Sequence, residues 1–328
     1  MQRAIRQKGK NEGMKNNLGK KPSILKQQRG ILIAFAVMFV FMCVVSENFF
    51  TVMNFNNLLK QIVTNGLLAF ALTYCLIIGE IDLSVGSIIA FAGVFMVKLL
   101  QLGLGFPAAL LVTFLAAVLI GCITGALVAC TKIPAFIVTL AMQNIIRGAA
   151  YLISGGIPIK AKNELFYSFG NGKILGIPNT VCVLILVIII FSILLHRTIF
   201  GRHMYAIGGN RSAAVYAGIP VRRDVVIVYV LSAALAILAG IMSASRIYQG
   251  QPTAGEGLEC DAIAAAVLGG VSFNGGVGNA FGVVMGALVL GLMSNGLNLL
   301  GVSYYWQLLF KGILIIVAVF ADVQKKDV

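Results

Sequence analysis

The sequence predicts an all-α membrane protein with about ten transmembrane helices, one of them short or re-entrant. Of the 328 residues, 59% are hydrophobic and only 11% are charged, and the mean hydropathy is +0.96. Soluble domains carry about 25% charged residues, which argues against a soluble enzyme. Several apolar runs reach the roughly 17–25 residues that a helix needs to cross the hydrocarbon, and such runs are not typical of barrel strands.

A basic segment precedes the first apolar run. Residues 1–29 hold nine lysine and arginine residues against a single acid, Glu12. Because the segment shows no apolar periodicity, we expect a disordered cytoplasmic tail over 1–29. A transmembrane domain is expected over 30–322, followed by a short cytoplasmic tail over 323–328.

The apolar runs set the expected spans. They lie at about 30–46, 58–78, 84–101, 107–130, 135–153, 180–196, 225–246, 261–273, 277–298 and 305–321. At 1.5 Å per residue, the run at 261–273 is too short to cross about 30 Å of hydrocarbon comfortably. We therefore expect a half-helix or a re-entrant segment there.

The placement of charge predicts the orientation. The net charge is +14, and the basic residues cluster between the spans. With the N-terminus inside, seventeen basic residues lie in cytoplasmic segments, and eight lie in outer loops or near the outer ends of spans. Positive charge favours the cytoplasmic side, which accounts for the basic balance without a nucleic-acid partner. The expectation is a multi-pass protein of the cytoplasmic (inner) membrane with both termini in the cytoplasm.

Several kinds of chemistry are missing from the sequence. No GxxxxGK[ST] motif is present, so the chain is not expected to hydrolyse ATP. No nucleophile–base or metal constellation is visible, and the six cysteines show no CxxC spacing. We therefore expect no catalytic residues, no metal and no cofactor in this chain, and interpret it as a non-enzyme.

A polar, basic island, Gly201–Pro220, stands between two long apolar runs. Arg197 precedes it, and Arg222 and Arg223 follow it. Its basic residues place it in the cytoplasm. Small residues in the island would permit the close approach of another protein.

A second polar stretch, GEIDLSVGS at 79–87, carries two carboxylates between apolar runs. Burial of unpaired carboxylates costs several kcal/mol. Two compatible interpretations are open: Asp82 or Ser84 caps the following helix, or Glu80, Asp82 and Ser84 line a polar path through the membrane.

Gln143, Asn144 and Arg147 share one face of the fifth expected span. This face either lines an aqueous cavity, where it would bind hydroxyl groups, or it points to the interface or holds a neighbouring helix. Farther along, the outer loop from Arg246 to Asp261 carries acids that either meet a basic partner outside the cell or remain solvated, with Asp261 capping a helix.

Three stretches together resemble the permease subunits of ATP-binding-cassette importers for monosaccharides of the ribose, xylose and galactose type. They are GEIDLSVGS at 79–87, GRHMYAIGGNRSAAVYAGI at 201–219 and DAIAAAVLGGVSFNGGVGN at 261–279. Members of that family commonly read GGIDLSVGS at the first stretch, whereas this chain has Glu80 at the second glycine. The resemblance covers about residues 30–322.

The resemblance implies an ABC-importer permease fold and one of two permease subunits, in a homo- or heterodimer, that form a pore in the bilayer. A separate ATPase subunit would bind ATP below the pore, and a substrate-binding protein would dock outside the membrane. The 201–219 stretch would be the segment that couples to the ATPase. The residues expected to act in coupling are Gly201, Arg202, Gly208, Asn210, Ala213, Ala214 and Gly218. The candidates for the translocation path are Glu80, Asp82, Ser84, Asn144 and Arg147.

Two alternatives remain open. An ATP-driven permease of the same class could carry nucleosides or branched-chain amino acids. An ion-coupled secondary transporter could use Glu80 and Asp82 as a proton relay, although the sequence shows no clear internal repeat of the kind common in such carriers.

Overall fold

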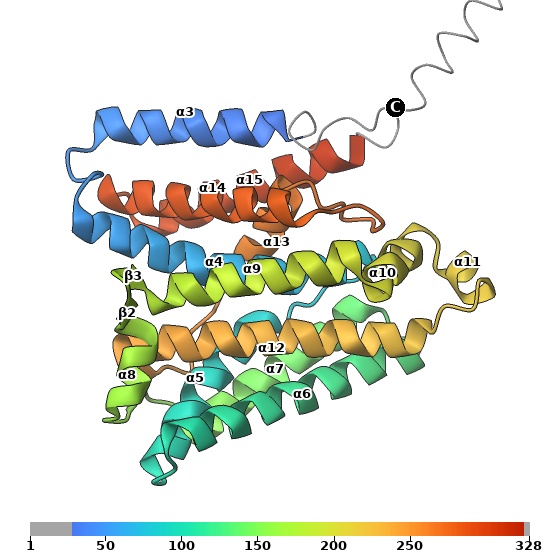
Figure 1. The fold of residues 1–328 in the computed structure, drawn as a ribbon, viewed down its shortest axis with the longest axis horizontal. Coiled ribbons are helices and arrows are strands. Elements are labelled where there is room, and N and C mark those ends of the chain that lie inside the picture. The colour runs from blue at the N-terminus through green and yellow to red at the C-terminus, as the bar shows by residue number, and fades with distance from the viewer. Residues whose placement is uncertain (1–27, 325–328) are drawn as a thin grey trace, which may run out of the picture.

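The computed structural model describes residues 28–324, and this part of the chain is built almost entirely from helices (Figure 1). The helices are α3 (Arg29–Val45), α4 (Val52–Ile77), α5 (Val85–Gln101), α6 (Phe106–Cys130), α7 (Ala135–Ser154), α8 (Glu164–Asn171), α9 (Asn179–Arg197), α10 (Ile199–Gly209), α11 (Arg211–Tyr216), α12 (Val221–Ile247), α13 (Leu258–Leu268), α14 (Ala280–Leu299) and α15 (Tyr304–Gln324). The strands are β1 (Ile159–Lys160), β2 (Lys173–Ile174), β3 (Ile177–Pro178) and β4 (Gln249–Gly250).

Each of the ten predicted spans overlaps one helix in the described part of the chain. Within that part, six helices are long and apolar enough to cross a membrane, namely α4, α6, α7, α9, α12 and α14. Helix α13 has 11 residues, so at 1.5 Å per residue it spans only about 16 Å, about half of the hydrocarbon. The expectation of one short segment at 261–273 is therefore confirmed.

The predicted tails lie almost wholly outside the described residues. At their edges the structure differs from the prediction, because α3 already begins at Arg29 and α15 continues to Gln324. Gln28 is buried, and its Nε2 donates to the carbonyl of Gly269 at 3.1 Å. The chain just before α3 is thus attached to the helix bundle.

Helices α4 and α12 form the centre of the bundle. In the most apolar stretch of each long helix, 83% of the residues of α4, 67% of those of α14 and 61% of those of α12 are buried, against 28–33% in α6, α7 and α9. Helix α12 packs against α4, α5 and α6, and α4 also packs against α13 and α14. The less buried helices α6, α7 and α9 therefore lie at the outside of the bundle.

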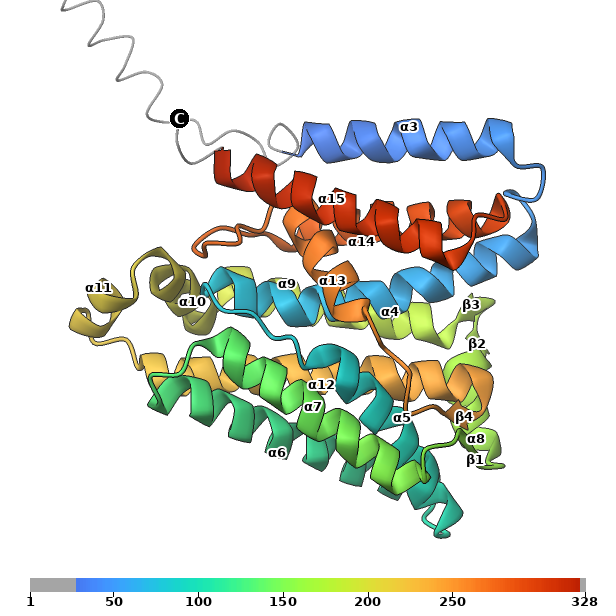
Figure 2. The same ribbon diagram turned by 180° about the vertical axis from the view of Figure 1, so that it is seen from behind.

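The structure contains an internal repeat of inverted direction, although the sequence shows no clear repeat. In each half, a long helix (α4 or α12) leads through a non-helical segment to a shorter helix (α5 or α13), and two further helices follow. Corresponding helices run in opposite directions (Figures 1 and 2). The repeat lies in the order and direction of the helices rather than in matching residues, so inspection of the sequence did not reveal it.

The two interrupted segments meet where α5 and α13 begin. A Cβ atom added to Gly86, in the first turn of α5, would lie 2.6 Å from the carbonyl oxygen of Gly255 and would also overlap the carboxylate of Glu259. Only glycine permits backbones to approach this closely. The extended segments 78–84 and 251–257 thus enter the bundle from opposite ends and meet inside it (Figure 2).

The end of the bundle that carries α8 also carries two short antiparallel pairs. Strand β1 pairs with β4, with Ile159 opposite Gly250. Strands β2 and β3 form a hairpin just before α9. The opposite end carries α10, α11, the start of α3 and the end of α15 (Figure 1).

Candidate functional site

Parts of all three stretches that carry the resemblance meet at the end of the bundle near α10. The backbone N–H of Gly276 donates to the carbonyl of Ile77, the last residue of α4, at 2.8 Å. The hydroxyl of Tyr205, on α10, donates to the carbonyl of Gly278 at 2.6 Å. Burial raises the pKa of Tyr205 to about 12, so this hydroxyl keeps its proton at neutral pH.

Gly208 is the tightest point of this junction. A Cβ atom at Gly208 would lie 2.5 Å from the backbone nitrogen of Gly276 and would overlap the carbonyl oxygen of Ile77. The expected coupling residue Gly208 therefore packs α10 against α4 and the 275–276 turn. The neighbouring Gly209 has open space around the same position.

The expected coupling segment consists of two short helices joined at Asn210. The side chain of Thr198 caps α10 by accepting from the N–H of Gly201 at 3.2 Å. Asn210 ends α10 and caps α11 by accepting from the N–H of Ala213 at 2.9 Å. Gly218 closes α11 with a φ of 79°, and the next residue, Ile219, donates to the carbonyl of Ala214 at 3.1 Å. This pattern of left-handed glycine and return bonds is a common helix ending.

The seven predicted coupling residues divide into an exposed and an inward set. Arg202, Asn210, Ala213 and Gly218 are exposed. Gly201 and Ala214 are buried, and Gly208 packs against backbone. The predicted set does not include the most exposed apolar residues of α11, Val215, which is 55% exposed, and Tyr216, which is 91% exposed. The tip of α11 is therefore an open surface that combines an aromatic ring, small residues and flanking arginines.

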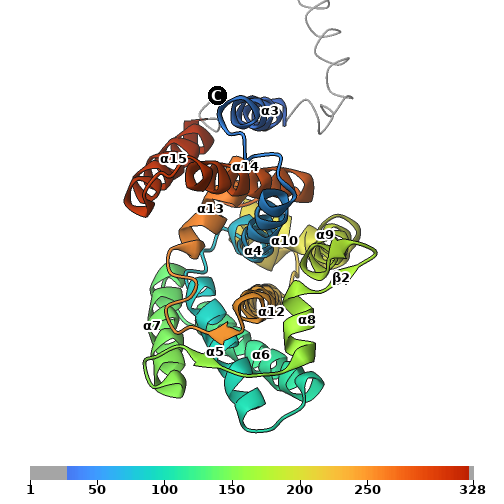
Figure 3. The same ribbon diagram turned by 90° about the vertical axis from the view of Figure 1, so that its left-hand side faces the viewer.

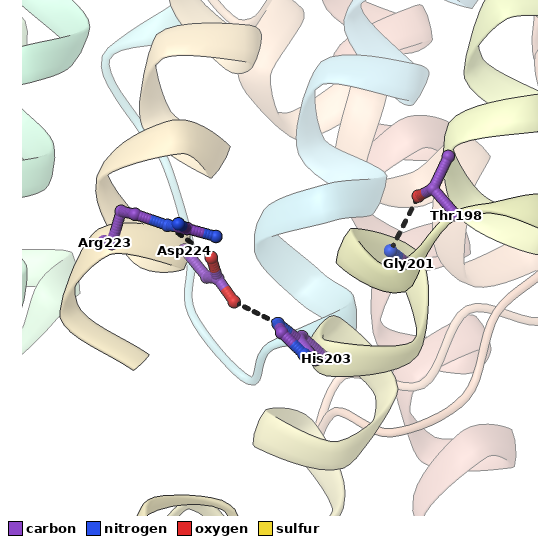
Figure 4. A network of polar contacts seen from close by, with 5 residues as sticks. All are labelled: Thr198, Gly201, His203, Arg223 and Asp224. Atoms are coloured by element: carbon purple, nitrogen blue, oxygen red, sulfur yellow. Dashed lines mark hydrogen bonds and ion pairs between the residues drawn. The ribbon is translucent and has the colours of Figure 1, made fainter. Parts of the chain in front are cut away.

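Polar contacts to the buried carboxylate of Asp224 join α10 to α12, and they were also missed from the sequence. His203 Nδ1 lies 2.6 Å from Asp224 Oδ2, and Arg223 Nε lies 3.4 Å from the other oxygen of the same carboxylate (Figure 4). Asp224 is fully buried. The available signal in the sequence was a single acid, Asp224, within a basic stretch. A buried carboxylate requires hydrogen-bonding or charged partners, such as His203 and Arg223.

Glu80 forms an ion pair with Arg211, the first residue of α11. Arg211 Nη1 lies 2.5 Å from Glu80 Oε1. The predicted path residue Glu80 thus contacts the expected coupling segment directly.

Asp82 and Ser84 lie inside the protein, each only 1% exposed. Asp82 accepts from the N–H and hydroxyl of Ser84, at 3.0 and 2.5 Å, and from the hydroxyl of Ser232 on α12 at 2.8 Å. Ser84 occupies the cap position of α5, but its hydroxyl does not cap that helix. The carboxylate therefore fixes the 78–84 segment to α12, and the expected cap of α5 by a side chain is not observed.

Helix α7 holds both interrupted segments. Thr139 Oγ1 donates to the carbonyl of Ile81 at 3.1 Å. Eight residues later, Arg147 Nη1 donates to the carbonyls of Pro252 and Ala254 at 2.9 and 2.6 Å. Of the alternatives for Arg147, the structure shows the one in which it holds a neighbouring segment.

The remaining polar candidates lie close to this segment. Asn144 is exposed on α7, and Glu256 is exposed just before α13. A helix cap was one of the two alternatives for Asp261, and it is not observed, because Asp261 lies in the first turn of α13 and its carboxylate pairs with Lys311 of α15 at 2.6 Å. Within residues 28–324, no group of three His, Cys, Asp or Glu side chains could hold a metal ion.

Comparisons with known proteins identify the chain's relatives. A family described as branched-chain amino acid transport system / permease component matches residues 54–319. The chain is 40% identical to the ribose import permease protein RbsC of Bacillus subtilis (strain 168) over 301 residues, which are 91% of this chain and 94% of that protein. It is also 40% identical to RbsC of Escherichia coli (strain K12) over 299 residues, 90% of this chain and 93% of that protein.

A third relative is named for a different sugar. The L-arabinose transport system permease protein AraH of Escherichia coli (strain K12) is 40% identical over 299 residues, 91% of each chain. No solved structure matches the chain. With a family match over residues 54–319 and relatives of 40% identity over nine tenths of its length, the chain belongs to the permease-component family of ATP-binding-cassette transport systems.

Proposed function

We propose that this chain is the permease subunit of an ATP-driven importer that carries a monosaccharide across the cytoplasmic membrane. The observation that carries the proposal is the 40% identity to ribose and arabinose import permeases over about nine tenths of the chain. The geometry is consistent with it, since the chain offers an exposed docking tip and polar interrupted segments but no catalytic constellation in the described residues.

The proposed topology has ten crossings and both termini in the cytoplasm. Segment 78–84 together with α5 makes one crossing, and segment 248–257 together with α13 makes another in the opposite direction. Helices α10 and α11 lie at the same end as the start of α3 and the end of α15 (Figure 1). The exposed arginines Arg202, Arg222 and Arg223 lie in or just after those two helices, which favours the cytoplasm for this end.

The proposed transport domain covers 30–322, between cytoplasmic tails at 1–29 and 323–328. The tip of α11, with Tyr216 and Val215 exposed, is the proposed contact with an ATPase subunit. ATP is bound by that subunit, so this chain needs no cofactor of its own. Movement of α10 and α11 during ATP hydrolysis would tilt the bundle and open the path alternately to each side.

A second permease copy is proposed on the face that carries α7, α13 and α15. These helices lie together on one side of the bundle, with α13 between the other two (Figures 2 and 3). The exposed residues there include Asn144, Glu256 and Cys260. Polar side chains at membrane depth are costly in lipid and generally face an aqueous path. A path between two copies, in a homo- or heterodimer, satisfies this requirement, and a substrate-binding protein would dock at the end that carries α8.

Uptake by the reconstituted complex tests the proposal. Proteoliposomes holding this chain and its ATPase subunit, with the binding protein added, should accumulate radiolabelled ribose or arabinose only when ATP is present. Accumulation of leucine or a nucleoside instead would move the substrate class to the first alternative. Uptake that follows a proton or sodium gradient and ignores ATP would contradict the proposal and support the secondary-transporter alternative.

A further inference from the structure

The ion pair between Arg211 and Glu80 connects the proposed ATPase-docking helix to the interior of the bundle. The two residues are 131 positions apart in the sequence, and their charged atoms are 2.5 Å apart. The side chain of Arg211 is 44% exposed, whereas that of Glu80 is 13% exposed. The pair therefore reaches from the surface into the protein.

Glu80 belongs to a segment that is attached on its other sides to three helices. Its N–H donates to the carbonyl of Cys75 in α4 at 2.9 Å. The next residue, Ile81, accepts from Thr139 of α7, and Asp82 accepts from Ser232 of α12. A displacement of Glu80 is therefore passed to the segment as a whole.

The same segment leads directly to the meeting point of the two interrupted helices. Helix α5 begins at Val85, and Gly86 touches the backbone at Gly255 of the opposing segment. That segment is held by Arg147 through the carbonyls of Pro252 and Ala254. A continuous series of contacts thus runs from Arg211, at the docking end, to the segment that enters from the opposite end.

Helix α11 has few other attachments of this kind. Asn210 bonds only to Ala206 at the end of α10 and to residues of α11, and the N–H of Gly218 donates to Val215 within α11. The longer contacts of the docking segment, from His203 and Tyr205, come from α10. Arg211 therefore gives α11 its own charged contact with the bundle, separate from those of α10.

We propose that the Glu80–Arg211 pair is a positioning link that transmits movement of α11 to segment 78–84 and so to the junction of α5 with the opposing segment. The inference rests on the proposed function, because it requires an ATPase that moves α11.

The expected size of the effect follows from the exposure of the pair. Ion pairs with a solvent-exposed partner contribute little to stability, so their loss changes an equilibrium by about two- to five-fold. Such a change leaves the fold intact. It is large enough to alter how often a movement of α11 is followed by a movement of segment 78–84.

The test measures the ratio of monosaccharide imported to ATP hydrolysed, in proteoliposomes of the whole complex. Glu80→Gln and Arg211→Gln each remove one charge, and the exchange Glu80→Arg with Arg211→Glu restores a pair of opposite charges. Arg222→Gln is the matched control, because Arg222 is an exposed arginine at the same end of the bundle and is not one of the expected coupling residues. Co-purification of the ATPase subunit with each variant verifies assembly.

Each single variant should lower the transport ratio about two- to five-fold while the ATPase still co-purifies. The exchange should recover most of that loss, and Arg222→Gln should keep the wild-type ratio. Two results would overturn the link. One is a wild-type transport ratio in both single variants, and the other is a double variant whose ratio falls by the combined losses of the two single variants. A wild-type complex without ATP-dependent uptake would instead refute the proposed function.

Discussion

Gly208 offers the sharpest test of how α10 is attached to the bundle. In Gly208→Ala, the new Cβ would lie 2.5 Å from the nitrogen of Gly276 and would overlap the oxygen of Ile77. Ordinary contacts of carbon lie at about 3.5–4.0 Å, so the overlap is at least about 1 Å against two backbone atoms. These atoms cannot move aside as a flexible side chain would. The hydrogen bond between Gly276 and Ile77, 2.8 Å long, would have to open.

The cost of this change can be estimated from its parts. Overpacking of this kind costs typically about 1–3 kcal/mol, and loss of a backbone hydrogen bond adds about 1 kcal/mol. Alanine gains up to about 1 kcal/mol over glycine in a helix, which offsets part of the loss. The net expectation is about 1–3 kcal/mol, or roughly a 5- to 150-fold change in the equilibrium that holds α10 in place.

Gly209→Ala is the matched control, since a Cβ at Gly209 meets nothing within 4 Å. The assay compares the thermal midpoint of the detergent-solubilised complex and its ATP-dependent uptake for both variants. Gly208→Ala should lower both quantities, whereas Gly209→Ala should leave them at or near the wild-type level. If the two variants behave alike, the backbone contact at Gly208 does not hold α10, and the reasoning is refuted.

Three further variants test the interior contacts and the docking tip. Arg147→Gln should lower the thermal midpoint by removing the charged donor to two carbonyls, at a cost of about 1–3 kcal/mol, and Asn144→Ala should not; equal midpoints would contradict the role given to Arg147. Lys311→Met should lower the midpoint more, because an unpaired buried carboxylate costs about 3–5 kcal/mol. Adding Asp261→Asn to the same chain should recover most of that loss, and a double variant no more stable than the single one would count against the pair. Tyr216→Ala should reduce co-purification of the ATPase subunit without changing the midpoint, and unchanged co-purification would remove Tyr216 from the docking surface.

Much of the helix arrangement was predictable because lipid imposes simple requirements. A run of apolar residues of sufficient length must form a helix, since every backbone group needs an internal partner in hydrocarbon. Accordingly, the boundaries of the runs predicted at 84–101 and 135–153 agree to within one residue with those of α5 (Val85–Gln101) and α7 (Ala135–Ser154). Polar segments obey no such rule. The joint between α10 and α11 depends on the cap at Asn210 and on contacts with distant residues.

Pairs of charged residues were the hardest features to predict, because nothing in their spacing indicates the partner. Glu80 and Asp82 are two residues apart, yet one pairs with a surface arginine of α11 and the other is buried among hydroxyls. Asp261 resembled a helix cap by position, but Lys311 lies on a neighbouring helix and neutralises it. The residue types therefore limited the possible roles of these acids, but only the packing of distant helices determines which partner each one has.

The inverted repeat did leave a signal in the sequence, which a search for matching residues could not detect. Both short apolar runs, at 84–101 and 261–273, follow a Gly-Glu pair, Gly79-Glu80 in the first half and Gly255-Glu256 in the second. Short, glycine-interrupted runs at corresponding places in two halves are the best sequence indication of discontinuous helices around a transport path. In this structure the two interruptions meet at Gly86 and Gly255. The inverted repeat is thus not by itself a reason to favour an ion-coupled carrier, because the chain that contains it belongs to the permease-component family of ATP-binding-cassette transport systems.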